Sequence, residues 1–252
     1  MIGHRARSRA HRCAGPEGSP RSAAPLLLLL TVVKGLVDAF SYLVLGHVFV
    51  ANMTGNVIFA GFAIAGALGF SLTATAVALA AFASGAFLGG RLIHRAGPHR
   101  GRILHRALVV ETVLVADAFL LAEVSGAPAG AGSRYALIAL LGLGLGVQNA
   151  AGRALAVPDL TTTVLTLTIT GPAADSRLAG SPGAKAGRRL LSAAAMFLGG
   201  LAGALVVLHV QPALPLLIGT VLLATGSGAA WWFTRSTAPW TQPVGAVLPA
   251  TG

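Results

Sequence analysis

The chain has 252 residues, of which 55% are hydrophobic and only 10% are charged. An average soluble domain is about 25% charged, so this composition excludes an ordinary soluble enzyme. The 18 Lys and Arg residues outnumber the 7 Asp and Glu residues, and the formal net charge is +11. Such a balance suggests nucleic acid, but the mean hydropathy of +0.78 leaves no soluble body to carry a nucleic-acid-binding face. We therefore expect a multi-spanning membrane protein with basic loops and no nucleic-acid partner.

The residues that most often bind metals are sparse. Cys13 is the single cysteine, so neither an intramolecular disulfide nor a cysteine-based metal site can form. The seven histidines include no pair at the i, i+4 spacing of a helical zinc motif. We expect no metal and no cofactor.

The two ends of the chain are more polar than the middle. Residues 1–24 contain five arginines without apolar periodicity, which predicts a disordered cytoplasmic tail, and residues 234–252 form a short C-terminal tail. A secretory signal peptide also combines a basic start with an apolar run. Further apolar segments follow, which favours a retained first helix.

Residues 25–233 read as an all-α integral membrane domain. Six apolar stretches approach the ~20 residues that cross a bilayer as a helix: 25–46, 71–93, 103–124, 135–157, 190–209 and 213–233. Two shorter stretches, 57–70 and 164–169, are entered through the polar residues 52–56 and 158–163.

Charge placement predicts what the short stretches do. Fifteen of the 18 basic residues lie in the N-terminal tail, in 91–106, in 177–189 and at Arg235. Because cytoplasmic loops collect Lys and Arg, these segments are expected on one side. Segments 52–70 and 158–172 then each start and end on the same side, as re-entrant or short broken helices. The prediction is six full spans, two half-membrane segments and both termini in the cytoplasm.

An internal repeat supports this topology. Residues 35–39 and 51–57 resemble 146–150 and 158–164, and 81–85 loosely matches 195–200. The repeats, 25–124 and 135–233, hold three full crossings each, so the second copy is inverted. Inverted repeats with interrupted helices are typical of secondary transporters.

Polar residues recur at matching points of the two repeats and predict a substrate site. They are Asp38, Asn52, Thr54 and Asn56 in the first repeat, and Gln148, Asn149, Asp159, Thr161, Thr162 and Thr163 in the second. Polar groups in hydrocarbon are costly unless they pair or line a wet cavity. The alternative is that they form hydrogen bonds between helices.

Carboxylates within the spans are candidate proton carriers. Asp38 is four residues after Lys34, so the two can form an ion pair on one helix face. Asp38 and Asp117 are the proton-coupling candidates, with Asp117 expected nearer the membrane centre. Glu111 is expected to pair with the arginine-rich loop before it. Glycines spaced four apart, including Gly85 and Gly89, indicate close helix packing.

The motifs resemble a known family. The segments 35–39, 46–57, 146–150 and 158–166 look like the YoaK family of bacterial inner-membrane proteins, a domain of unknown function. The most specific part is Ala-Asn-Met-Thr-Gly-Asn at 51–56. The resemblance covers about residues 25–233. It implies an integral protein of the bacterial cytoplasmic membrane without an established substrate.

Two functions are consistent with the sequence. The first is a secondary transporter or carrier of a small solute or ion, with its site between the broken segments. The second is a non-transporting scaffold, stress or assembly factor whose basic loops bind anionic lipid or a partner. A polar cavity between the broken segments would favour the first, and dry packing the second. No catalytic triad, carboxylate pair or metal motif supports an enzyme, and a homo-oligomer stays open.

Overall fold

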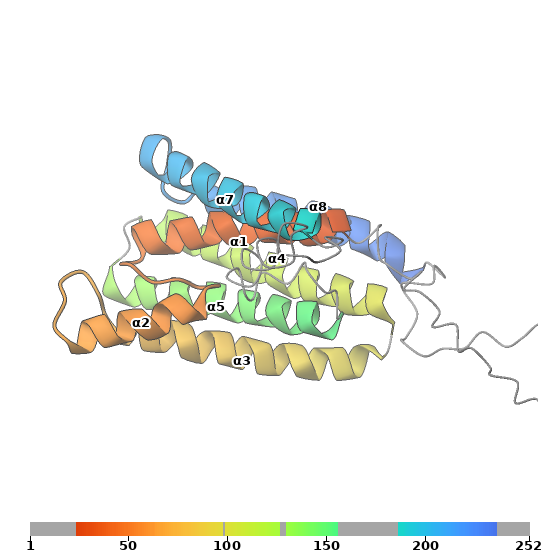
Figure 1. Ribbon diagram of the computed structural model, residues 1–252, viewed down its shortest axis with the longest axis horizontal. Helices are drawn as coiled ribbons and strands as arrows, with labels where there is room; N and C mark the ends of the chain where they lie inside the picture. The colour runs from red at the N-terminus through yellow and green to blue at the C-terminus, as the bar shows by residue number, and fades with distance from the viewer. Residues whose placement is uncertain (1–23, 98, 127–129, 156–185, 236–252) are drawn as a thin grey trace, which may run out of the picture.

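The computed structural model describes residues 24–97, 99–126, 130–155 and 186–235, all of whose regular structure is helical (Figure 1). The helices are α1 (Ala24–Val44), α2 (Met53–Ile64), α3 (Leu72–Ala96), α4 (Arg100–Ser125), α5 (Ala131–Ala154), α7 (Ala186–His209) and α8 (Leu214–Thr234). The predicted all-α class is confirmed. The second predicted half-membrane segment, 158–172, lies outside the described residues.

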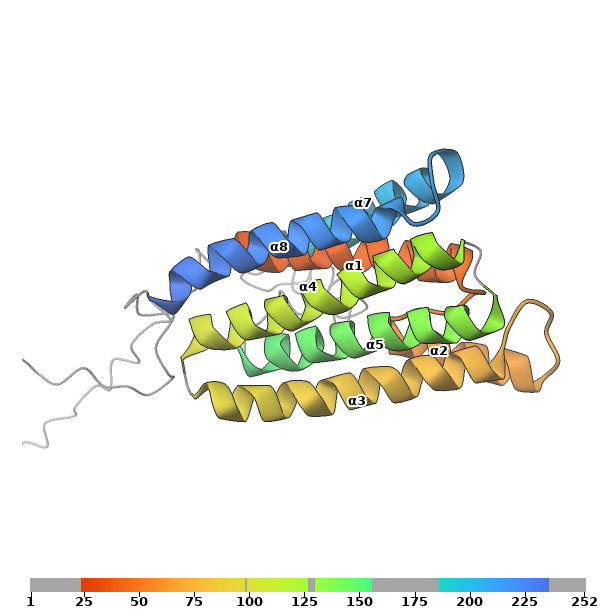
Figure 2. The same cartoon turned by 180° about the vertical axis from the view of Figure 1, so that it is seen from behind.

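Most of the long helices suit a bilayer. Five of them, α1, α3, α5, α7 and α8, are long and apolar enough to cross a membrane. The predicted crossing at 103–124 falls in α4, which has 26 residues but also carries Glu111, Asp117 and Glu123. Helix α4 lies between α5 and α8 in the bundle, as the rear view shows (Figure 2).

Glycines allow two pairs of helices to touch backbone to backbone. Helix α1 packs on α7, and α3 packs on α5. A Cβ added at Gly85 of α3 would collide with the backbone of Leu143 on α5, and one added at Gly199 of α7 would collide with the backbone of Val32 on α1. The two helices of each pair run in the same direction, and the α1–α7 pair runs opposite to the α3–α5 pair (Figure 1). The close packing expected from the glycine spacing is present in both pairs.

The connection between α1 and α2 turns back into the bundle. Val48 and Val50 of this connection are fully buried. The backbone N–H groups of Val50 and Ala51 donate to Oδ1 of Asp38, at 3.0 and 2.9 Å. Because Asp38 lies six residues before the end of α1, α2 begins about 9 Å inside that end of the bundle.

Helix α2 then runs back out to the end from which the chain came (Figure 1). It has 12 residues, which span about 18 Å, too short to cross a bilayer. The structure therefore has a short helix within the predicted segment 52–70, from Met53 to Ile64. Gly66 and Gly69, which adopt positive φ values of 83° and 86°, form the turn to α3.

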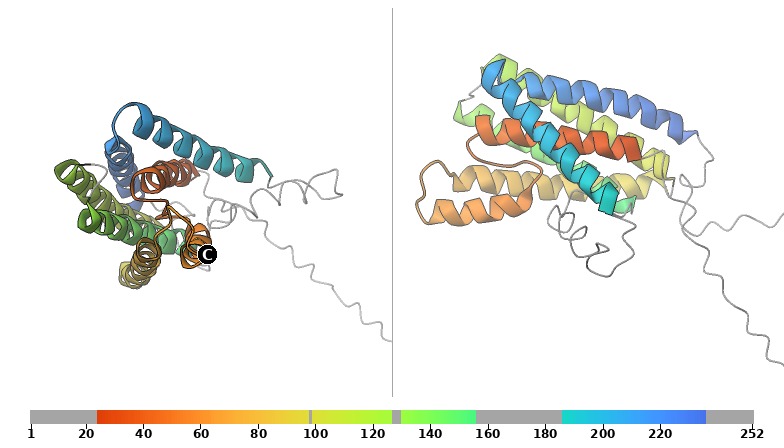
Figure 3. Two further views of the ribbon diagram at one scale, coloured as in Figure 1. Left: turned by 90° about the vertical axis from the view of Figure 1, so that its left-hand side faces the viewer. Right: turned by 45° about the horizontal axis from the view of Figure 1, so that its top comes forward.

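Helix α1 occupies the centre of the bundle, with contacts to α5, α7 and α8 (Figure 3). Its inward side chains, Val33, Val37 and Phe40, are fully buried. The polar residues that α1 carries between these apolar ones, Lys34 and Asp38, are thereby held between the helix pairs.

Candidate functional site

Three helices bring polar side chains together inside the bundle. Helix α1 provides Lys34 and Asp38, α4 provides Glu111, and α5 provides Gln148. Asp38, Glu111 and Gln148 are only 4%, 0% and 5% exposed. Lys34 is near enough to interact electrostatically with both carboxyl groups. These four residues, the central polar cluster, form the candidate site.

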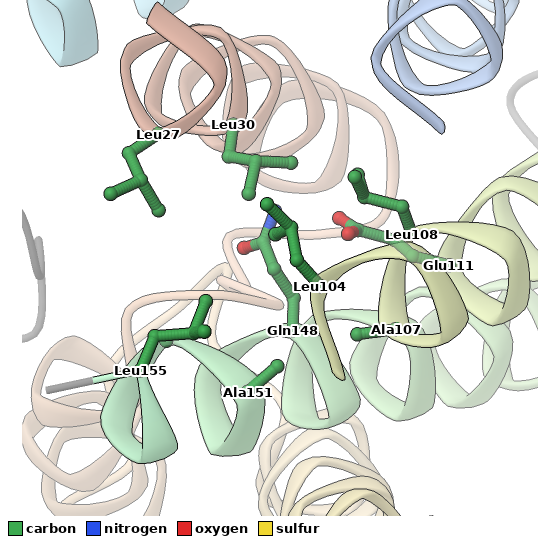
Figure 4. A pocket seen from close by; sticks show the side chains of 10 residues that line it. Leu27, Leu30, Leu104, Ala107, Leu108, Glu111, Gln148, Ala151 and Leu155 are labelled. Atoms are coloured by element: carbon green, nitrogen blue, oxygen red, sulfur yellow. The ribbon is translucent and has the colours of Figure 1, made fainter. Parts of the chain in front are cut away.

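A small cavity opens beside Glu111 and Gln148 (Figure 4). Its volume is about 10 Å³, close to what a single water molecule needs. Its other walls are apolar and come from the start of α1, the start of α4 and the end of α5: Leu27, Leu30, Leu104, Ala107, Leu108, Ala151, Gly152 and Leu155. These three helix ends lie at the same end of the bundle, opposite to the turn that follows α2 (Figure 1).

The side chains at this cavity have unused hydrogen-bonding capacity. Neither carboxyl oxygen of Glu111 has a hydrogen-bond partner, and the same is true of the amide oxygen and nitrogen of Gln148. Gln148 is close enough to influence Glu111, yet the two side chains do not meet in hydrogen-bond geometry. A buried polar group without a partner costs about 1–3 kcal/mol, so native proteins keep such groups mainly where water, an ion or a ligand satisfies them.

Asp38 has a different environment. Its Oδ1 accepts the two backbone hydrogen bonds from Val50 and Ala51, whereas its Oδ2 is buried without a hydrogen bond. Asp38 therefore fixes the inward turn that precedes α2 and also presents one oxygen to the interior. The sequence pattern marks Asp38 as a candidate site residue but does not indicate these two anchoring bonds.

Asn56 also holds the inward turn. It is fully buried, its Oδ1 accepts from the backbone N–H of Phe49 at 2.9 Å, and its Nδ2 donates to the backbone oxygen of Phe49 at 2.6 Å. Asn56 therefore stabilises the turn, and its substrate-binding role stays a prediction. Asn52 and Thr54, at the start of α2, are exposed, and the Asn52 side chain does not cap the helix.

The structure places two carboxylates on α4 differently from the expectation. Glu111 was expected to pair with the arginine-rich loop, yet it is fully buried in the cluster. Asp117 was expected near the membrane centre as a proton carrier, yet its side chain is exposed. A separation of six residues places the two side chains about 120° apart around the helix, so they cannot share one face. The spacing predicted this divergence but not which residue would face inward.

Of the second-repeat residues, Gln148 lies in the cluster and Asn149 is half-buried next to it on α5. Asp159, Thr161, Thr162 and Thr163 lie outside the described residues. Within the part of the chain that the structure describes, no three His, Cys, Asp or Glu side chains are grouped so as to hold a metal ion.

Comparisons with known proteins agree with the fold. Residues 26–228 match the model of the family described as "Protein of unknown function (DUF1275)". The UPF0700 transmembrane protein YoaK of Bacillus subtilis (strain 168) is 32% identical over 146 residues, which are 57% of this chain and 63% of that protein. The chain thus matches somewhat less than two thirds of that relative's length. No solved structure matches. The resemblance to the YoaK family is confirmed, and the chain belongs to the DUF1275 family of transmembrane proteins.

Proposed function

We propose that this protein is a secondary transporter that carries a small solute across the bacterial cytoplasmic membrane through the central polar cluster. The observation that carries the proposal is the burial of Asp38, Glu111 and Gln148, with the half-buried Lys34 beside them, between helices that are otherwise apolar. In membrane proteins, ionisable residues inside the bundle mark solute and ion pathways by default. No catalytic role is assigned to these residues.

The helix packing supports an inverted repeat. Gly35 of α1 lies against the backbone of Met196 and Gly200 on α7, while Gly146 of α5 lies against the backbone of Phe82 and Ala86 on α3. Gly35 and Gly146 are the first residues of the motifs that match between the repeats. Each repeat thus contributes its first long helix to a pair with the second long helix of the other, as in carriers whose site lies between inverted halves.

The distribution of charge supports an orientation. The arginines at the end of α3, the start of α4, the end of α5 and after α8 lie at one end of the bundle: Arg91, Arg95, Arg100, Arg102, Arg106, Arg153 and Arg235. The positive-inside rule assigns this end to the cytoplasm. Arg235 also stacks over the ring of Trp231, 4.1 Å from its centroid, a pairing suited to the membrane interface. Since α1 starts at this end as well, both termini are assigned to the cytoplasm.

The narrow cavity favours the alternative of a non-transporting scaffold. A space for one water molecule holds no organic solute, so a carrier would have to open the bundle between its halves. Such an opening would have to part α4 from α5 or from α8, because α4 packs on both. The two functions therefore differ in whether the cluster ever becomes accessible to solutes.

A transport assay that assumes nothing about the identity of the solute separates the two functions. The purified protein is reconstituted in liposomes loaded with the desalted small-molecule extract of bacterial cells, and the compounds released are identified by mass spectrometry. A carrier releases at least one compound several-fold faster than protein-free liposomes do. The substitution Gln148→Leu removes that release, whereas Gln211→Leu, the same change at an exposed position, retains it. Equal release with and without protein would support the scaffold.

A further inference from the structure

We propose that Glu111 is the residue at which the protein takes up and releases a proton. The use of this proton as the coupling ion of a carrier rests on the function proposed above. The exchange of a proton at Glu111 depends only on the buried cluster.

The net charge of the cluster depends on its three ionisable side chains. Lys34 carries one positive charge when ionised, and Asp38 and Glu111 together carry two negative charges. Among the described residues, the other helices packed against α4 contribute no compensating group at this level: α8 contains no titratable residue, and those of α3 and α5 lie near the helix ends. On α4 itself, the ring of His105 is already engaged with Ser227 of α8. The fully ionised trio has a net charge of −1, and one proton makes it neutral.

The two carboxyl groups differ in the hydrogen bonds that they receive. Asp38 receives two backbone hydrogen bonds, and hydrogen bonds of this kind favour the ionised carboxylate. Glu111 receives none. A protonated Glu111 has one O–H to donate, and the amide oxygen of Gln148 is a neighbouring acceptor without a partner. The proton therefore belongs on Glu111, while Asp38 keeps its charge opposite Lys34.

The route of proton exchange is the cavity beside Glu111. Glu111 borders the cavity that has room for one water molecule (Figure 4). A hydronium ion there transfers its proton to the Glu111 carboxylate and remains as water, and deprotonation is the reverse. The cavity lies toward the arginine-rich end of the bundle, so exchange occurs from that side in this conformation.

Infrared difference spectroscopy of the reconstituted protein tests this assignment. Spectra are recorded at mildly alkaline and mildly acidic pH, in H₂O and in D₂O. The wild-type protein should gain a C=O stretching band of a protonated carboxyl group on acidification, with the D₂O shift typical of such groups. Glu111→Gln should lose this band. Asp117→Asn, which removes an exposed carboxylate from the same helix, should keep it.

Two further variants test the assignment even if Glu111→Gln does not fold. Glu111→Asp keeps the carboxyl group and should keep a band at a shifted frequency, and Gln148→Leu removes the acceptor and should shift the band of Glu111. A band that is unchanged in Glu111→Gln, or that responds to added sodium chloride instead of pH, would overturn the inference. If the carboxyl band depends on Glu111 but the liposomes release no solute, the proposed transporter function is contradicted. If the liposomes release solute but the band does not depend on Glu111, only the proton site is contradicted.

Discussion

Asn52 and Asn56 lie one helical turn apart at the start of α2, yet their surroundings are opposite. Asn56 is fully buried and forms two hydrogen bonds with the backbone of Phe49, whereas the side chain of Asn52 is exposed. Both belong to the motif by which the chain resembles the YoaK family. One motif thus combines a residue that builds the inward turn with a residue that is free to meet other molecules.

This contrast predicts different costs for the same substitution. Asn56→Ala leaves the backbone N–H and C=O of Phe49 without their partners, and a buried unpaired polar group costs about 1–3 kcal/mol. Asn52→Ala breaks no cap hydrogen bond and should change stability by less than about 0.5 kcal/mol. Thermal unfolding in detergent measures both. Equal losses in the two variants would show that the hydrogen bonds to Phe49 do not hold the turn.

Residue-level roles were only partly predictable from the sequence. The pattern marked Asp38, Asn56 and Gln148 as unusual for a membrane segment, and the structure places all three in the interior. The bonds of Asp38 to Val50 and Ala51 were not predictable, because they depend on a connection that folds back onto its own helix. The exchange of roles between Glu111 and Asp117 was not predictable either, since helical periodicity fixes angles between side chains but not the face that a neighbouring helix covers.

At the scale of elements, the bundle depends on two backbone-to-backbone helix contacts. Gly85 and Gly199 lie where a side chain would meet the backbone of the facing helix, and backbone cannot move aside as a flexible side chain can. Small residues at such crossings let membrane helices approach closely, which strengthens their van der Waals packing.

Alanine substitutions at these glycines should therefore be destabilising despite the higher helix propensity of alanine. Gly85→Ala and Gly199→Ala should each lower the free energy of unfolding by about 1–3 kcal/mol, the usual cost of overpacking. Gly90→Ala is the matched control on α3, because a Cβ there meets nothing within 4 Å, and its expected effect is neutral or stabilising by up to about 1 kcal/mol. Denaturation in mixed micelles compares the three. If Gly90→Ala proved as harmful as the other two, the close contacts would not explain the effect.

The sequence predicted the elements better than their limits. Glycine spacing and apolar length identified the long helices, because both follow from local composition. The short helix begins where the predicted segment 52–70 begins, but it ends at Ile64, before the turn that Gly66 and Gly69 form.

At the scale of the whole molecule, the pairing of α1 with α7 and of α3 with α5 places the central polar cluster where the two halves meet. The correspondence of helices between the two repeats stays a prediction from the matched motifs. They could not predict that the cavity would be as small as a water molecule, because cavity size depends on how leucines such as Leu30 and Leu104 fill the space between helices. These leucines line the cavity together with Gln148.

Alternating access of Gln148 is the most direct test of a carrier. Cys13 is replaced by Ser, Gln148→Cys is introduced, and a membrane-impermeant thiol reagent is applied to sealed vesicles of each orientation. Ser125→Cys and Arg95→Cys, exposed residues at opposite ends of the bundle, are the controls and should each react from one side only. A carrier predicts that position 148 reacts from both sides, because the bundle opens to each in turn. Reaction from one side only, or from neither, would contradict transport through the central polar cluster.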